Sequence, residues 1–342
     1  MQKKYFKIVS IVLLLCLVYF LCCILIPRKF EAPKMQYIAG AKYWNLPTGS
    51  RISYTFIPAK GIKKPYPIIY LEGGPGGAYG QGNIASLSPL TEDGYDVYLY
   101  DQIGSGRSAR LENIKEYTAE RHKKDLEEII KKTGSEKVIL IGQSWGAILA
   151  VFFAADNASL IDRIIFTGPG PIYPYHGSLA KIQAPDSLHL RDPYLTNAQG
   201  NEKAKNLRSM AIKFFARKFG WKLASDKEAD NFLDYTGTFV GRSTLCDTSK
   251  HAEPSGGNGF YVQEMTMQTL NQMPDPRPKL KNSRIPVLIM KGQCDNQKWG
   301  FVTEYLELFP DHQLTIIPNS GHAISFEQPE LYLKTIRNFL SK

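Results

Sequence analysis

The sequence predicts an α/β fold in which a mostly parallel sheet is covered by helices on both faces. Short apolar runs rich in branched residues alternate with helical patterns, as in parallel strands joined by crossover helices. One of these runs, 138–141, continues directly into a glycine-flanked turn and a small-residue helical stretch. The alternation stops near 171 and resumes at 284, so a single domain with an insertion accounts for most of the 342 residues.

Strands and helices can be assigned in order along the chain. We expect strands at 51–57, 66–71, 95–100, 138–141, 163–167, 286–290 and 313–317. Helices are expected over 112–132 (where Gly134 supplies the stop), directly after the turn at 142–146, and over 301–308 and 329–340. The predicted parts are an N-terminal anchor (1–30), a core in two pieces (31–170 and 284–342) and an inserted helical cap (171–283).

An uncharged apolar run over 8–26 lies near the start of the chain. As a helix its 19 residues reach roughly 30 Å, the thickness of a bilayer core, which predicts a single membrane-spanning anchor. A cleaved signal peptide is the alternative, but no small-x-small cleavage site follows the run. Three N-terminal lysines predict a cytoplasmic N-terminus and a catalytic domain outside the cytoplasm, whereas Arg28 and Lys29 oppose this orientation.

The net charge of +10 does not indicate a nucleic-acid-binding protein. Five of the 42 basic residues flank the apolar run, and the remaining 37 stand against 32 acidic residues. The sequence contains no arginine-rich tract and no nucleic-acid-binding motif. We therefore expect a membrane partner through the N-terminal helix, and no nucleic acid.

Only two of the five cysteines, Cys246 and Cys294, lie outside the predicted anchor. In an oxidising compartment these two could pair. Their spacing in the sequence does not decide the matter, and we expect two unrelated free thiols.

The predicted cap contains prolines and aromatics but few strand-like runs. Over 201–219 its apolar residues recur on one side of a helix, with many lysines elsewhere. We expect a lid that shapes a substrate pocket, with a plain surface insertion as the alternative. A basic face this close to an anchor could also touch lipid.

Gly-Gln-Ser-Trp-Gly at 142–146 has the pattern of a nucleophile elbow. Such a turn holds its serine between a strand and a helix, with flanking glycines because the turn leaves no room for side chains. Ser144 is therefore the predicted nucleophile. Its partners should follow later strands in the order aspartate, then histidine, which selects Asp295 after 286–290 and His322 after 313–317.

The oxyanion of such a reaction needs two backbone N–H groups aimed at one point. Trp145, directly after the nucleophile, should supply one of them. Gly74, in the Glu-Gly-Gly-Pro-Gly-Gly loop at 72–77, should supply the other. A simple turn and a phosphate loop are the alternatives for this loop, but the Gly-Lys-Ser/Thr of a phosphate loop is absent.

These motifs together resemble the prolyl iminopeptidase family of α/β-hydrolases. The resemblance covers roughly 40–170 and 284–342, and it rests on the motifs at 72–77, 101–108 (Asp-Gln-Ile-Gly-Ser-Gly-Arg-Ser), 142–146, 292–295 and 321–322. It implies an α/β-hydrolase fold and removal of N-terminal residues, often proline, by Ser, His and Asp without a metal or cofactor. It also implies acidic side chains in the cap that hold the free amine of the substrate.

The chain departs from the family pattern in three places. Glu72 stands where the family usually has His, Ile103 where it has Arg, and Gly-Asn-Gly-Phe-Tyr at 257–261 replaces Glu-Asn-His-Tyr-Phe. If this alignment holds, the amine-binding glutamate of the cap is missing. Glu264 or Glu72 could supply a carboxylate instead, with a structural or solvent-facing role as the alternative for each.

The expected function is that of a membrane-anchored serine aminopeptidase. An esterase or amidase acting on small acyl substrates would use the same triad without amine recognition. A catalytically silent binding protein is the third possibility, which the intact set of Ser144, Asp295 and His322 disfavours.

Overall fold

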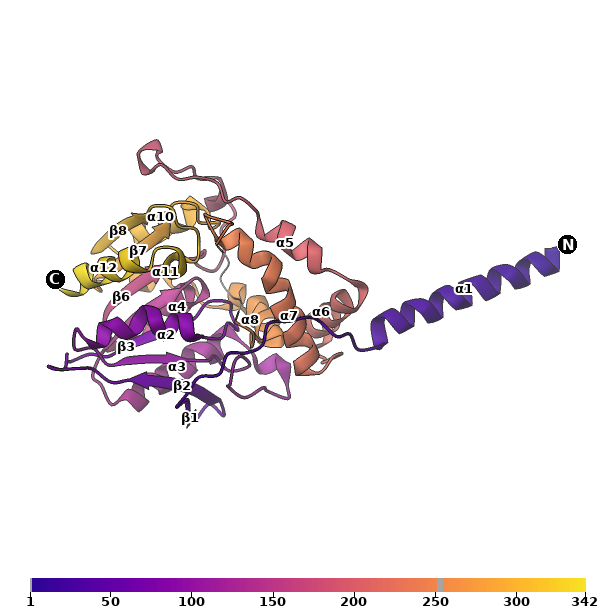
Figure 1. Ribbon diagram of the computed structural model, residues 1–342, viewed down its shortest axis with the longest axis horizontal. Helices are drawn as coiled ribbons and strands as arrows, with labels where there is room; N and C mark the ends of the chain where they lie inside the picture. Colours follow the sequence, from indigo (N-terminus) through magenta and orange to yellow (C-terminus); the bar gives the residue numbers. More distant parts are fainter. Residues whose placement is uncertain (1, 251–254) are drawn as a thin grey trace.

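The computed structural model describes residues 2–250 and 255–342. Within this part of the chain, eight strands form one sheet in the order β1-β2-β4-β3-β5-β6-β7-β8 (Figure 1). The two strands β1 and β2 pair antiparallel, as do β2 and β4, and the remaining neighbours are parallel. The strands are β1 (Lys42–Asn45), β2 (Arg51–Ile57), β3 (Ile68–Leu71), β4 (Val97–Tyr100), β5 (Val138–Gln143), β6 (Ile161–Thr167), β7 (Val287–Gly292) and β8 (His312–Ile317).

Helices cover both faces of this sheet, which confirms the predicted α/β architecture. Successive strand side chains point to opposite faces, so Ile69 and Leu71 join one apolar core whereas Ile68 and Tyr70 join another. The first core includes α3 (Ala119–Thr133), α4 (Trp145–Asn157), α9 (Arg277–Leu280) and α10 (Trp299–Leu308). The second includes α2 (Gln81–Leu87), α11 (Ile324–Glu327) and α12 (Pro329–Leu340).

Between β6 and β7 the chain leaves the sheet and forms a group of helices beside one end of it (Figure 1). They are α5 (Asn197–Ala204), α6 (Leu207–Phe219), α7 (Asp226–Val240) and α8 (Phe260–Thr269). The single helix expected over 201–219 is two helices, because Asn206 is extended and its side chain accepts the Ser209 N–H at 3.0 Å. Asn206 is therefore the N-cap of α6, and it separates α6 from α5.

The N-terminal helix α1 (Gln2–Leu25) projects away from the rest of the protein (Figure 1). Among the described residues, it is the one helix long and apolar enough to cross a membrane, over Lys4–Leu25. Its apolar side chains are not buried against the protein.

An extended arm, residues 26–41, joins α1 to β1 and lies on the protein surface. The Phe30 ring packs against Phe232 and Tyr235 of α7, with ring centroids 5.2 and 5.8 Å apart. Further along, the Gln36 side chain accepts the Gln81 N–H at 2.8 Å, at the start of α2. The arm therefore contacts both the inserted helices and the core.

The structure joins Cys246 and Cys294 in a disulfide, so our expectation of two free thiols was wrong. The segment after α7 returns to the end of β7, which brings the two Cα atoms to 5.2 Å although 48 positions separate them in the sequence. The course of the chain in the fold, and not the local sequence, brings the two cysteines together. The bond links the insertion to the loop that carries Asp295.

Candidate active site

Ser144 lies in a sharp turn between β5 and α4. Its backbone has φ 55° and ψ −110°, a strained conformation for a residue with a side chain. Close packing explains the flanking glycines: a Cβ on Gly142 would meet the Gly146 carbonyl oxygen at 2.5 Å, and a Cβ on Gly146 would collide with the Leu71 carbonyl oxygen. The turn thus holds the Ser144 side chain at the carboxyl end of the sheet, as the motif predicts.

Asp295 and His322 meet above the neighbouring strand ends. Asp295 follows β7, His322 follows β8, and His322 Nδ1 lies 2.9 Å from Asp295 Oδ1. A carboxylate at this distance accepts the Nδ1 proton, which leaves Nε2 as the free base of the imidazole. Ser144 and His322 line the same cavity of about 470 Å³, and in the described residues no hydrogen bond joins their side chains.

The Asp295 side chain is buried and lies between the His322 imidazole and the Lys291 ammonium. Its Oδ1 accepts the Gln297 N–H at 3.0 Å as well as His322 Nδ1, and its Oδ2 lies 3.5 Å from the buried Lys291 ammonium. Burial raises the pKa of Asp295, but Lys291 and His322 lower it by more, to about 2. Asp295 is therefore a carboxylate at every pH at which the protein would work, as an orienting partner must be.

Two backbone N–H groups beside Ser144 donate no hydrogen bond to any described residue: those of Gly74 and Trp145. Gly74 has φ +115°, and a Cβ there would lie 2.6 Å from Gly77 N, so glycine is required. The Trp145 indole donates to Gln102 Oε1 at 2.9 Å, which fixes the first turn of α4. Both N–H groups predicted for the oxyanion are thus available for a ligand.

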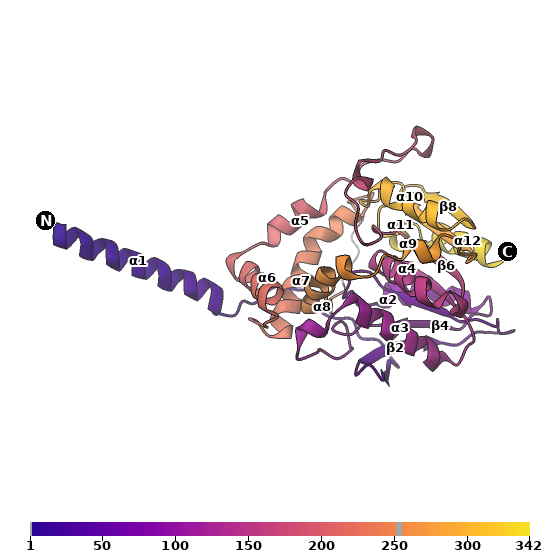
Figure 2. The same cartoon turned by 180° about the vertical axis from the view of Figure 1, so that it is seen from behind.

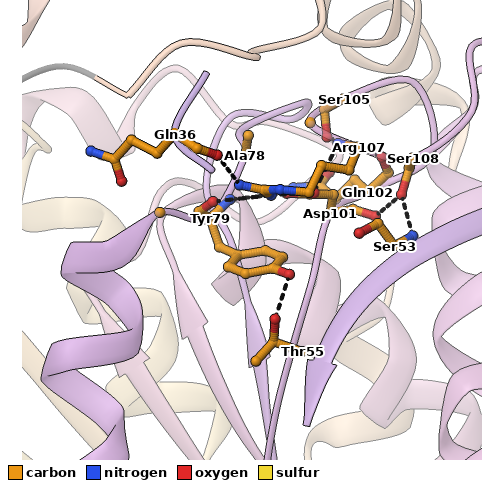
Figure 3. A network of polar contacts seen from close by, with 12 residues as sticks. Gln36, Ser53, Thr55, Ala78, Tyr79, Asp101, Gln102, Ser105, Arg107 and Ser108 are labelled. Atoms are coloured by element: carbon orange, nitrogen blue, oxygen red, sulfur yellow. Dashed lines mark hydrogen bonds and ion pairs between the residues drawn. The ribbon is translucent and has the colours of Figure 1, made fainter. Parts of the chain in front are cut away.

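A polar network links the motif at 101–108 to Tyr79, just after the glycine-rich loop, and to Gln36 of the arm (Figure 3). Asp101 forms a buried ion pair with Arg107 at 2.7 Å and accepts the Tyr79 N–H at 3.2 Å. Arg107 also donates to the carbonyl oxygen of Gln36 in the arm at 2.9 Å. Burial raises the pKa of Asp101, although Arg107 opposes the shift. The motif at 101–108 thus holds the loop in place, a role that our sequence analysis did not assign to these residues.

Gln102 connects this network to the loop itself. Its amide nitrogen donates to the carbonyl oxygens of Glu72 and Gly73 at 3.1 and 3.0 Å, and its oxygen accepts the Gly76 N–H at 3.2 Å. One side chain therefore binds the loop backbone before and after Gly74, which holds the Gly74 N–H in a fixed position.

Glu72 lies in the wall of the cavity that contains Ser144 and His322. Its carboxylate accepts the Gly73 N–H at 2.8 Å and the Asn83 amide at 2.9 Å, and no cationic side chain in the described residues forms an ion pair with it. Burial raises the pKa of Glu72 to about 7, against the lowering effect of the Gly73 hydrogen bond. A smaller cavity of about 150 Å³, also lined by His322, continues behind it toward Tyr70 and Tyr332.

The structure does not bring Glu264 to this cavity. The side chain lies on the face of α8 that packs against α6, and its carboxylate pairs with Arg217 at 2.6 Å and Lys213 at 3.0 Å. Its neighbour Gln263 lines the cavity instead. Among the residues that the structure describes, the insertion contributes only uncharged side chains to the lining: Asn197, Asn201, Leu233, Thr236, Val240, Ser255, Asn258 and Gln263.

The described residues contain no group of three or more His, Cys, Asp or Glu side chains that could hold a metal ion. The polar groups at the site are a serine in a strained turn, an imidazole bound to a carboxylate, and two N–H groups without a partner among the described residues, a set that suits acyl transfer.

Comparisons with known proteins relate this chain to α/β-hydrolases. A family model described as alpha/beta hydrolase fold matches residues 66–329. A proline iminopeptidase of Clostridium botulinum is 34% identical over 290 residues, which cover 82% of this chain and 91% of that protein. One of Saccharolobus solfataricus is 25% identical over 299 residues, covering 86% and 90%. Among solved structures, an esterase of Exiguobacterium antarcticum is similar in fold, with a TM-score of 0.58 and 19% identity over 88% of this chain and 99% of that one.

Proposed function

Since the chain belongs to the alpha/beta hydrolase family, among its proline iminopeptidase-like members, we propose that it is a membrane-anchored serine aminopeptidase. One observation carries the proposal. A single cavity has Ser144, His322 and the carboxylate of Glu72 in its wall, and that carboxylate has no cationic partner among the described residues. Such a cavity offers a nucleophile, a base and an anionic group for a substrate amine.

The proposed reaction follows from the positions of these groups. His322, with Nδ1 bound to Asp295, takes the Ser144 proton at Nε2 while Ser144 Oγ bonds to the substrate carbonyl carbon. The resulting oxyanion accepts hydrogen bonds from the Gly74 and Trp145 N–H groups. The C–N bond then breaks as His322 protonates the leaving amine. Water attacks the acyl-enzyme, gives its proton to His322, and releases the acid and Ser144.

We assign the substrate amine to Glu72 and not to Glu264. Glu264 already neutralises Lys213 and Arg217, whereas Glu72 has a lone pair free on each oxygen beside the glycine-rich loop. A substrate ammonium at Glu72 would form a charge-assisted hydrogen bond in an enclosed site, where such bonds are strong. The small lobe behind Glu72 suits a short first residue.

The remaining parts of the proposal concern the N-terminal helix and the insertion. The helix α1 would hold the protein in a membrane with the hydrolase domain outside the cytoplasm, a location compatible with the disulfide between Cys246 and Cys294. The inserted helices, within 171–283, would act as the lid over the cavity, because α5, α7 and the segment leading into α8 provide its outer wall.

A substrate panel tests the peptidase against its alternative. Because the described residues of the insertion place no carboxylate in the wall of the cavity, a neutral acyl substrate is the second candidate. Proline and alanine arylamides, their N-acetylated forms and short nitrophenyl esters would be compared with the purified full-length protein in detergent. We expect arylamide turnover that disappears when the amine is acetylated. Ester hydrolysis with no arylamide turnover would contradict the peptidase and support the esterase.

We expect Glu72→Gln to raise KM for free-amine arylamides about 10-fold, the value of one charge-assisted hydrogen bond. Protonation near pH 7 removes the Glu72 charge, so the wild-type ratio of kcat/KM for arylamide to kcat/KM for ester should fall as pH drops below about 7. His322 serves both substrates and cancels in this ratio. The ratio should be lower and flat in Glu72→Gln and unchanged in Glu264→Gln. Equal ratios in Glu72→Gln and wild type would exclude Glu72 as the amine site.

A further inference from the structure

Helix α6 and the turn after it expose a continuous group of large apolar side chains, which we call the α6 surface. Its members and their exposed fractions are Leu207 (44%), Met210 (49%), Phe214 (56%), Phe219 (37%) and Trp221 (59%). The first three recur at helical spacing on one side of α6, and the rings of Phe214, Phe219 and Trp221 are in contact, with centroids 5.9 and 4.9 Å apart. Soluble surfaces rarely gather aromatic side chains in this way without a partner.

Basic side chains accompany these apolar ones along the same helix. Lys213, Arg217 and Lys218 are all exposed; the first two pair with Glu264, whereas Lys218 forms no ion pair among the described residues. Aromatic and aliphatic side chains on one face of a helix, with lysine and arginine beside them, are the composition of helices that lie in the boundary between head groups and acyl chains. Tryptophan in particular favours this boundary.

The position of α6 relative to α1 identifies the partner. Arg208, in the first turn of α6, donates to the carbonyl oxygen of Ile24 in the last turn of α1, and it forms a buried ion pair with Glu228 at 2.8 Å. Glu228 in turn accepts the Arg28 N–H at 2.9 Å, directly after α1. Two opposite views both place α6 beside the end of α1 (Figures 1 and 2). The end of α1 is thus bound to the start of α6.

We propose that the α6 surface binds the phospholipid bilayer that α1 spans, at the head-group boundary where α1 emerges. The inference rests on the proposed anchoring and goes beyond it, because a spanning helix alone would leave the domain free to tilt. Because Arg208 contacts Ile24 in the last turn of α1, the start of α6 would lie at the point where α1 leaves the membrane. Insertion of Phe214, Phe219 and Trp221 then removes their exposed area from water, and the exposed Lys218 beside them reaches the lipid phosphates.

Quenching of tryptophan fluorescence by brominated lipid tests this contact in the full-length protein. The protein would be placed in nanodiscs of phosphatidylcholine and phosphatidylglycerol, with or without bromine near the head-group end of the acyl chains. Wild type should lose emission in the brominated discs. Trp221→Phe, a conservative change at an exposed position, should lose nearly all of this quenching, whereas Trp44→Phe, on the distant strand β1, should keep it.

The outcomes separate this inference from the anchoring. Flotation of the protein with liposomes reports anchoring alone. Flotation with equal quenching in wild type and Trp221→Phe would overturn the α6 contact and leave the anchor standing. Crosslinks between the α6 surfaces of two copies, without quenching by lipid, would also overturn the proposal, since the surface would then belong to a dimer. Failure to float would remove both proposals.

Discussion

Replacing Ser144 by alanine is expected to reduce kcat for every substrate by about 10³- to 10⁶-fold, because the other described hydroxyls of the cavity, Thr236 and Ser255, do not lie in the elbow between β5 and α4. Initial rates with arylamide and ester substrates measure the loss, and covalent labelling by a fluorophosphonate probe should disappear with it. Ser178→Ala changes an exposed serine of the insertion and should keep full activity and labelling. Unchanged hydrolysis by Ser144→Ala would refute the nucleophile assignment.

Asp295→Asn is expected to lower kcat by about 10³- to 10⁴-fold while leaving KM little changed. An asparagine amide can present N–H to His322 Nδ1 and so favour the imidazole tautomer with its proton on Nε2, which cannot act as a base toward Ser144. The change also leaves the buried Lys291 ammonium without its carboxylate, so stability should fall by about 3 kcal/mol.

A second variant separates the two effects of Asp295→Asn. Adding Lys291→Met removes the unpaired buried charge and should restore most of the thermal stability, measured as Tm, without restoring kcat. Recovery of activity together with stability would mean that Asp295 supports the fold and not the imidazole.

The sequence predicts seven of the eight described strands, because each of these carries its own apolar signal and each functional motif directly follows a strand. The strand β1 was missed, since its four residues are mostly exposed and carry no such signal. The apolar run at 138–141 and the glycines at 142 and 146 specify β5 and the elbow almost without reference to the rest of the chain. The order aspartate then histidine likewise places Asp295 and His322 at neighbouring strand ends, because β7 and β8 are parallel and adjacent. Local patterns therefore contain the core and the three proposed catalytic residues.

Features that depend on how distant segments meet were not predictable in this way. Glu264 and Gln263 are adjacent in the sequence, yet the rotation of α8 turns Gln263 toward the cavity and Glu264 toward Arg217. The pairing of Cys246 with Cys294 depends on the return path of the insertion. Arg107 and Gln36 carry no common motif, and their contact arises because the arm lies against the start of α2, next to Arg107.

The arm has a practical consequence for preparing a water-soluble form of the protein. Removal of everything ahead of the first strand would delete the Gln36 carbonyl that binds Arg107 and the Phe30 ring that covers Phe232, and so would expose an apolar seam and loosen the loop that carries Gly74. A truncation point between Ile26 and Arg28 would remove the apolar helix α1 and retain these contacts, including the hydrogen bond from the Arg28 N–H to Glu228.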